Sequence, residues 1–190
     1  HVMVDGCQGI VHGGGRVAER GYDFYAFSGH KLYGPTGIGV LYGRRELLET
    51  MPPFMGGGDM VDKVTFAKTT YAPLPLKYEA GTSNFIGAVG LAEAINYVEN
   101  IGVEAIEAYE QELLRYMTER LSTIEGLRIY VGMILDKLGV AIRTGHHCAE
   151  PVMTHFGVTG MCRASIGMYN TLSEVDVLAQ GIERAVRMLK

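Results

Sequence analysis

The stretch SGHKLYGPTGIG, residues 28–39, limits the possible folds most, since it sets one lysine among glycines, a proline and a histidine directly after a predicted strand. The aromatic and small residues of 22–28 predict that strand, and GIGVLYG at 37–43 predicts the next. We expect both, and a third strand at VMVD (2–5), to be buried in a sheet. Polar residues that follow such strands collect at the carboxyl edge of the sheet, where α/β proteins bind their ligands.

The remaining elements are predicted from periodicity and turn residues. Four of the six prolines fall within 51–84, which predicts a long ordered loop with one short strand. Apolar residues recur at helical spacing over 85–100 and 103–124. Further strands are expected at 127–131, 140–144 and 162–168, with a short helix at 133–139 and a closing helix capped by Ser173 and Asp176. This alternation of helices and strands predicts an α/β fold.

Composition and charge narrow the function classes. With 190 residues, 47% of them hydrophobic and 20% charged, the chain has the balance of one packed domain or two small ones. The net charge of −4 is spread over interspersed acids and bases, which excludes the basic stripe of a nucleic-acid binder. No apolar run reaches the roughly 20 residues of a membrane span, and the first residues lack the layout of a signal peptide. We therefore expect a cytoplasmic protein that binds neither nucleic acid nor a membrane.

Lys31 and Asp5 are the first candidates for chemistry. A single lysine after a turn is most often an exposed surface residue, and a single aspartate after a strand is most often a turn or cap residue. Here Asp5 ends one predicted strand and Lys31 comes soon after another, so both are expected at one edge of the sheet. That pair suits pyridoxal phosphate (PLP), because a carboxylate keeps the ring nitrogen protonated while a lysine amine holds the aldehyde carbon.

A second candidate is Cys148, which follows two histidines in RTGHHCAEP at 143–151. Three interpretations stay open. The thiol is a nucleophile whose pKa is lowered by His146, His147 or Arg143; it binds zinc with the histidines, although consecutive residues rarely converge on one tetrahedron; or it is an inert packed thiol. The three cysteines of the chain form no CxxC pair, so at least one is expected to be free.

Several segments resemble the SufS-type (group II) cysteine desulfurases and selenocysteine lyases of the aminotransferase class V family. The most specific are FSGHKLYGPTGIG (27–39) and RTGHHCAEP (143–151), and VDGCQ (4–8), EAGTSN (79–84) and MCRAS (161–165) follow in the family's order. The resemblance covers nearly the whole chain. It implies a PLP-dependent transferase fold of the aspartate aminotransferase type, in which 1–101 is the C-terminal part of a large mixed-sheet PLP domain and 102–190 is a small C-terminal α+β domain.

The resemblance also implies residue roles at the cofactor. Lys31 would form the bond to PLP, Asp5 would pair with the pyridine nitrogen, and Gln8 would contact the phenolic oxygen. Ser28 and His30 would hold the phosphate. No metal is implied.

The remaining implied roles concern the substrate and the partners. Arg163 would bind the substrate carboxylate with Arg143 beside it, and Cys148 would take the sulfur of L-cysteine, or the selenium of L-selenocysteine, to leave alanine. Thr82 would reach the phosphate of the neighbouring subunit's PLP, which implies a homodimer. The persulfide on Cys148 would pass to an acceptor of the SufE or SufU type for iron–sulfur cluster assembly.

The chain departs from the family pattern in two places. The family's large domain begins well before VDGCQ, and about twenty family residues are absent at a join after Gly132, more than an ordinary connection contains. We expect either part of a longer protein or a truncated product. Two alternatives to a desulfurase therefore stay open, namely another class V PLP lyase and a non-catalytic binding or dimerisation module.

Overall fold

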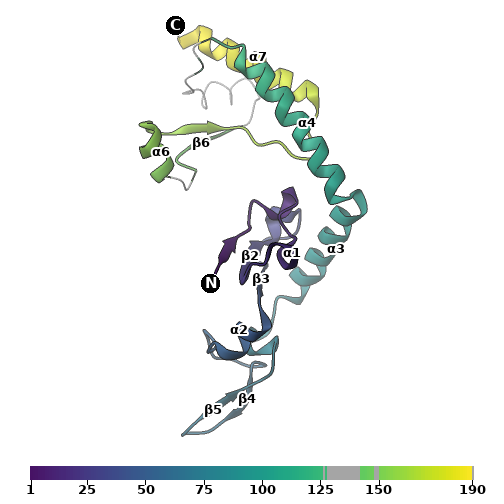
Figure 1. Cartoon of the computed structure of the whole chain (residues 1–190), viewed down its shortest axis with the longest axis vertical. Coiled ribbons are helices and arrows are strands. Elements are labelled where there is room, and N and C mark those ends of the chain that lie inside the picture. The colour runs from purple at the N-terminus through teal and green to yellow at the C-terminus, as the bar shows by residue number, and fades with distance from the viewer. Residues whose placement is uncertain (126, 128–141, 148–149, 190) are drawn as a thin grey trace. The chain divides into compact units, whose positions relative to one another are not determined.

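A computed structural model describes residues 1–125, 127, 142–147 and 150–189 (Figure 1). The chain divides into two compact units, His1–Glu104 and Ala105–Lys190, and each is described by itself. The strand predicted at 127–131 (apart from Leu127), the helix predicted at 133–139 and Cys148 lie outside the described residues. Among the described residues, no helix combines the length and apolarity that crossing a membrane requires.

The first unit is built on a three-stranded sheet, in the order β1 (Met3–Asp5), β2 (Phe24–Ser28), β3 (Gly39–Gly43). β1 and β2 are parallel, with Asp5 opposite Ala26, whereas β3 runs antiparallel to β2. The three predicted strands are therefore confirmed. Because β1 and β2 are parallel neighbours, their carboxyl ends share one edge of the sheet.

The expectation that all three strands are buried is wrong. Met3 on β1 is 65% exposed and Leu41 on β3 is 57% exposed, whereas Tyr25 on β2 is only 3% exposed. β2 has a neighbour on both sides, but β1 and β3 are the edges of this sheet. The apolar composition of the strands predicted the sheet correctly without revealing which strands lie at its edges.

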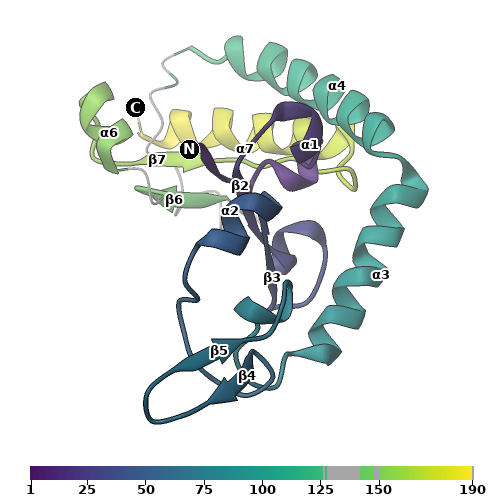
Figure 2. The same ribbon diagram turned by 60° about the horizontal axis from the view of Figure 1, so that its bottom comes forward.

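Segment 51–84 contains a hairpin rather than one short strand. β4 (Val61–Val64) pairs antiparallel with β5 (Thr69–Tyr71). Thr65 closes the turn, since its Oγ1 donates to Lys68 O (2.8 Å) and accepts from Lys68 N (3.0 Å). The hairpin lies apart from the three-stranded sheet (Figures 1 and 2). The prediction missed it because both strands are short and surrounded by glycine and proline.

The predicted helix at 85–100 is confirmed as α3 (Phe85–Ile101). Asn84 caps it, with Oδ1 accepting from Gly87 N at 2.9 Å. Leu91 is buried on its inner face, and a Cβ added at Gly34 would lie 3.1 Å from Leu91 Cδ1. A Cβ added at Gly90 would lie equally close to Pro35. α3 therefore packs directly on the loop that follows Lys31.

Short elements that the sequence did not predict connect these parts. They are η1 (Ile10–His12), α1 (Val17–Arg20), η2 (Gly29–Leu32), α2 (Arg45–Thr50) and η3 (Leu76–Tyr78) in the first unit, and α6 (Glu150–Phe156) in the second. Each has at most seven residues, which is too short for a periodic apolar pattern to identify.

The second unit packs the predicted helices α4 (Val103–Ser122) and α7 (Leu172–Leu189) beside a ribbon of β6 (Arg143–Gly145) and β7 (Met161–Arg163). One cluster of its core contains the buried α7 residues Leu178, Ile182 and Ala185, with partly buried residues such as Met117 of α4 against them. The strand predicted at 162–168 is wrong beyond Arg163. The chain turns there instead, and Gly167 N donates to Asn170 Oδ1.

The predicted cap of the closing helix is also wrong. Ser173 lies inside α7, and the reciprocal pair is formed by Thr171 and Glu174. Thr171 N donates to Glu174 Oε2 (2.8 Å), while Glu174 N donates to Thr171 Oγ1 (3.3 Å). The capping box therefore lies two residues earlier than predicted, which leaves Asp176 available for a different contact.

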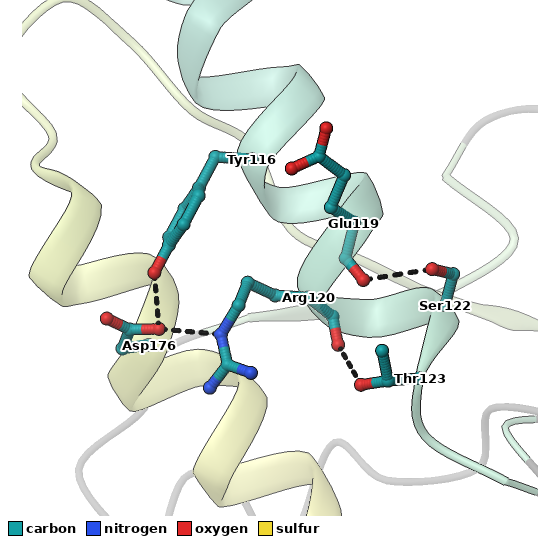
Figure 3. A network of polar contacts seen from close by, with 6 residues as sticks. All are labelled: Tyr116, Glu119, Arg120, Ser122, Thr123 and Asp176. Atoms are coloured by element: carbon teal, nitrogen blue, oxygen red, sulfur yellow. Dashed lines mark hydrogen bonds and ion pairs between the residues drawn. The ribbon is translucent and has the colours of Figure 1, made fainter.

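Asp176 joins α7 to α4 (Figure 3). Its Oδ1 accepts from Tyr116 Oη at 2.9 Å and from Arg120 Nε at 2.7 Å. The hydrogen bonds from Arg120 and then Tyr116 lower the pKa of Asp176, and the bond to Asp176 raises the pKa of Tyr116. The carboxylate thus holds the two helices together at the surface of the apolar core.

This contact predicts a pH-dependent stability of the second unit. Because the pKa of Asp176 is lowered by folding, its contribution is complete above the ordinary aspartate pKa of 3.8 and is lost as the pH falls through the folded-state value. We expect Asp176→Asn to lower the melting temperature by a few degrees at pH 7 and by less at pH 3. Glu183→Gln, on the same helix, is the control. A difference between wild type and Asp176→Asn that is as large at pH 3 as at pH 7 would contradict this account.

Candidate functional site

Five of the six predicted cofactor residues of the first unit lie at or just after the carboxyl edge of its sheet, and Thr82 is the exception. Asp5 is the last residue of β1 and Ser28 is the last residue of β2. Gln8 lies in the turn after β1, and His30 and Lys31 lie in η2, which begins where β2 ends. Strand pairing, rather than nearness in sequence, therefore brings these five residues to one edge.

The backbone around Lys31 is tightly constrained. Gly29 is buried, and a Cβ added there would lie 2.9 Å from Ile38 Cγ2. Gly29 N donates to Ile38 O, and Gly34 N donates to Gly29 O. These two hydrogen bonds fix the backbone turn that contains Lys31, directly after the sheet edge. The Lys31 side chain is half-buried.

Asp5 is poised as an ionised carboxylate. Its Oδ1 accepts from Cys7 N at 3.0 Å, and this bond from the Cys7 backbone is the main reason why the pKa of Asp5 is lowered. A carboxylate that stays charged can accept a hydrogen bond from a protonated ring nitrogen. This is the property that an aspartate needs beside PLP.

Cys7 links the two strand ends. Its Sγ lies 3.7 Å from Ser28 Oγ, within the range of a weak sulfur hydrogen bond. The side chain is half-buried between the turn that follows Asp5 and the end of β2. The contact shows that the two turns lie against each other.

Tyr25 packs against the turn that follows Asp5, a contact that the sequence did not predict. Its hydroxyl donates to Gly6 O at 3.3 Å, and its ring stacks with Tyr22 at 5.9 Å between centroids. A Cβ added at Gly6 would overlap the ring of Tyr25. Only glycine fits between Asp5 and Cys7 at this place.

We expect Gly6→Ala to lower the free energy of unfolding by about 2 to 3 kcal/mol, because the added methyl must displace a buried ring. Chemical denaturation monitored by tyrosine fluorescence measures the loss. Gly56→Ala is the matched control, since a Cβ there meets open space. Equal denaturation midpoints for the two variants would show that the Tyr25 ring yields without cost.

The other predicted residues are placed as follows. Thr82 is exposed in the loop before α3, two residues before the cap Asn84.

Arg143 and Arg163 belong to the second unit, where they are direct partners in the β6–β7 ladder, and both are exposed. Residues directly opposite each other in an antiparallel ladder project from the same face, so both arginine side chains leave the ribbon on one side.

The residues of the first unit fit PLP. The edge combines an ionised Asp5, the hydroxyl of Ser28 and the amine of Lys31, which are the donor and acceptor types that a pyridinium nitrogen, a phosphate and an aldehyde require. Cys148, the predicted nucleophile, lies outside the described residues.

Comparison with known proteins agrees with the geometry. The aminotransferase class-V family matches residues 1–133 and 130–178. A cysteine desulfurase of Serratia proteamaculans is 47% identical to the chain over 99% of its length and 52% of the relative's length. The chain thus spans about half the length of the curated relatives it matches.

Solved structures give the same result. The cysteine desulfurase CsdA of Escherichia coli, an S-sulfonic acid form, is 41% identical with a TM-score of 0.93, over 98% of this chain and 52% of that one. The apo cysteine desulfurase of Thermococcus onnurineus is 36% identical with a TM-score of 0.92 over the same shares. These neighbours confirm the predicted α/β fold of the PLP-dependent transferases.

The predicted discontinuity after Gly132 also has a counterpart in the comparisons. The two family matches meet at 130–133. The alignment with the Serratia protein extends over 209 positions although the chain has 190 residues, so gaps open on the side of this chain. The family match, the Serratia relative and the two structural neighbours each extend over nearly all of the sequence. The chain therefore belongs to the aminotransferase class-V family.

Proposed function

We propose that the chain is the lysine-bearing and cysteine-bearing part of a PLP-dependent cysteine desulfurase, which converts L-cysteine to L-alanine and leaves a persulfide on Cys148. The observation that carries this proposal is the shared carboxyl edge of β1 and β2, where Asp5 and the Ser28–Lys31 segment come together. Its likeness to cysteine desulfurases over the whole of its length supports the same reaction. In this proposal 1–101 completes a large PLP domain and 102–190 forms the small domain.

Each residue at the sheet edge has a separate task. PLP, when bound, supplies an electron sink that stabilises negative charge at the substrate Cα. The Lys31 amine would anchor the cofactor and, when free, would take the Cα proton as general base. Asp5 would keep the ring nitrogen protonated by accepting its hydrogen bond, and Ser28 and His30 would bind the phosphate. Gln8 would contact the phenolic oxygen.

The second unit supplies the sulfur chemistry. Arg163, with Arg143 opposite it, binds the substrate carboxylate and orients Cβ. The Cys148 thiolate attacks the substrate sulfur, so that a sulfur–sulfur bond forms as the carbon–sulfur bond breaks, and the three-carbon product is protonated to alanine. The persulfide then passes to a thiol of an acceptor protein.

The partners follow from the same proposal. Thr82, exposed before α3, reaches the phosphate of a second copy in a homodimer. A SufE-type or SufU-type protein accepts the sulfur for iron–sulfur cluster assembly in the cytoplasm. L-selenocysteine is an alternative substrate, because selenium accepts the same thiolate attack.

The experiment is to incubate the purified protein with PLP and L-cysteine, and to measure alanine and the sulfide released by dithiothreitol. We expect equal amounts of the two products, and a parallel reaction with L-selenocysteine compares the substrates. Alanine without reducible sulfur would point to another PLP lyase. Neither product, together with normal folding by circular dichroism, would favour a non-catalytic module.

A further inference from the structure

His147 occupies an unusual place at the end of the β6–β7 ribbon. The last ladder pair joins Gly145 to Met161, and His147 lies two residues beyond Gly145. Its Nε2 lies 2.7 Å from Met161 O. A carbonyl oxygen only accepts, so Nε2 carries the proton and donates. The imidazole therefore ties the turn after β6 to β7 at the point where the backbone ladder ends.

Two unfavourable features accompany this contact. The backbone of His147 is left-handed, with φ of 54°, a conformation that few residues other than glycine adopt. Its Nδ1 is buried and has no hydrogen-bond partner within the described part of the chain. Sparsely populated backbone conformations persist where the surrounding structure holds them in place, and together with unsatisfied buried atoms they are found most often at functional sites.

The strand that His147 holds carries the proposed substrate arginine. Met161 is two residues before Arg163, and Arg163 is the direct ladder partner of Arg143. Directly opposite residues of an antiparallel ladder have their Cβ atoms on the same face, so the spacing of the two arginine side chains depends on how β6 and β7 are held together. A donor fixed to Met161 O resists displacement of β7 relative to β6.

We propose that His147 is a positioning residue: by donating to Met161 O it fixes β7 against β6 and thereby sets the spacing of Arg143 and Arg163 for a substrate carboxylate. The inference rests on the proposed function, in which these arginines bind that carboxylate. It gives the second histidine of the HHC motif a task other than lowering the pKa of a thiol or binding zinc.

The test measures how well L-alanine, the proposed product with the same carboxylate, protects Arg163 from phenylglyoxal in the complete chain with PLP, with the adducts located by mass spectrometry. L-alanine is not turned over and, unlike the aminothiol of L-cysteine, does not form a thiazolidine with the reagent. His147→Phe keeps a ring without the donor, and His147→Asn suits the left-handed backbone but is too short to reach Met161 O. His147→Gln restores a long N–H donor. His155→Phe, an exposed histidine on α6, is the matched control.

We expect His147→Phe and His147→Asn to raise the L-alanine concentration for half-protection about tenfold, as the loss of one well-formed hydrogen bond implies. His147→Gln should stay near wild type, as should His155→Phe. Unchanged half-protection in both His147→Phe and His147→Asn would overturn the inference and leave the proposed function standing. Absence of protection in the wild-type chain would overturn the carboxylate role on which both depend.

Discussion

Lys31→Ala is expected to reduce alanine release from L-cysteine at least about 10³-fold, because the variant loses both the covalent anchor of the cofactor and the general base. We expect no other amine to replace it, since the turn from Gly29 to Gly34 holds this lysine near the edge shared by Asp5 and Ser28. Steady-state alanine production at saturating L-cysteine and added PLP measures the effect.

Lys63→Ala is the matched control, as Lys63 is an exposed residue of the β4–β5 hairpin. It should retain wild-type turnover. Retention of more than a tenth of the activity by Lys31→Ala would contradict the assignment and would direct attention to another lysine.

Cys148→Ser is expected to lower sulfur transfer at least about 10³-fold, because a hydroxyl at this position is a far weaker nucleophile toward sulfur and the nucleophile has no substitute. The variant should still change the PLP absorbance when L-cysteine is added, since Lys31, Asp5 and the arginine pair are intact. Persulfide trapped by alkylation and located by mass spectrometry gives the readout.

Cys162→Ser and Cys7→Ser test whether the effect is specific to Cys148, because both are free, half-buried thiols of the same chain. We expect no persulfide on either residue and near-normal sulfur transfer in Cys162→Ser. Full sulfur transfer by Cys148→Ser would remove Cys148 from the mechanism and leave Cys7, beside Ser28, as the thiol to examine.

The sequence predicted the sheet edge because that edge follows from local rules. Runs of aromatic and β-branched residues identify strands, and polar residues after parallel strands share one edge, so Asp5 and Lys31 could be assigned to one place. The long helices over 85–101 and 103–122 were equally accessible, since their apolar residues repeat at helical spacing. Their length makes the pattern unmistakable.

Contacts between distant residues were not accessible in this way. The hydrogen bond from Tyr25 Oη to Gly6 O depends on how β2 lies against the turn after β1. So does the overlap with the Tyr25 ring that any side chain at Gly6 would cause. The hydrogen bond from His147 Nε2 to Met161 O depends on the register of β6 and β7. The predicted cap of α7 was two residues too late, because Ser173 and Asp176 have the same spacing as Thr171 and Glu174. Asp176 instead binds Arg120 of α4, and this tertiary contact distinguishes the two candidate capping boxes.

The most direct test of the central claim is to reduce the protein with borohydride in the presence of PLP and to locate the phosphopyridoxyl group by peptide mass spectrometry. Our account predicts one predominant site, Lys31, and loss of most of the label when Asp5 is changed to Ala, because the ring then lacks its partner at the sheet edge. Label distributed over exposed lysines such as Lys63 and Lys68, with Lys31 unmodified, would contradict the account.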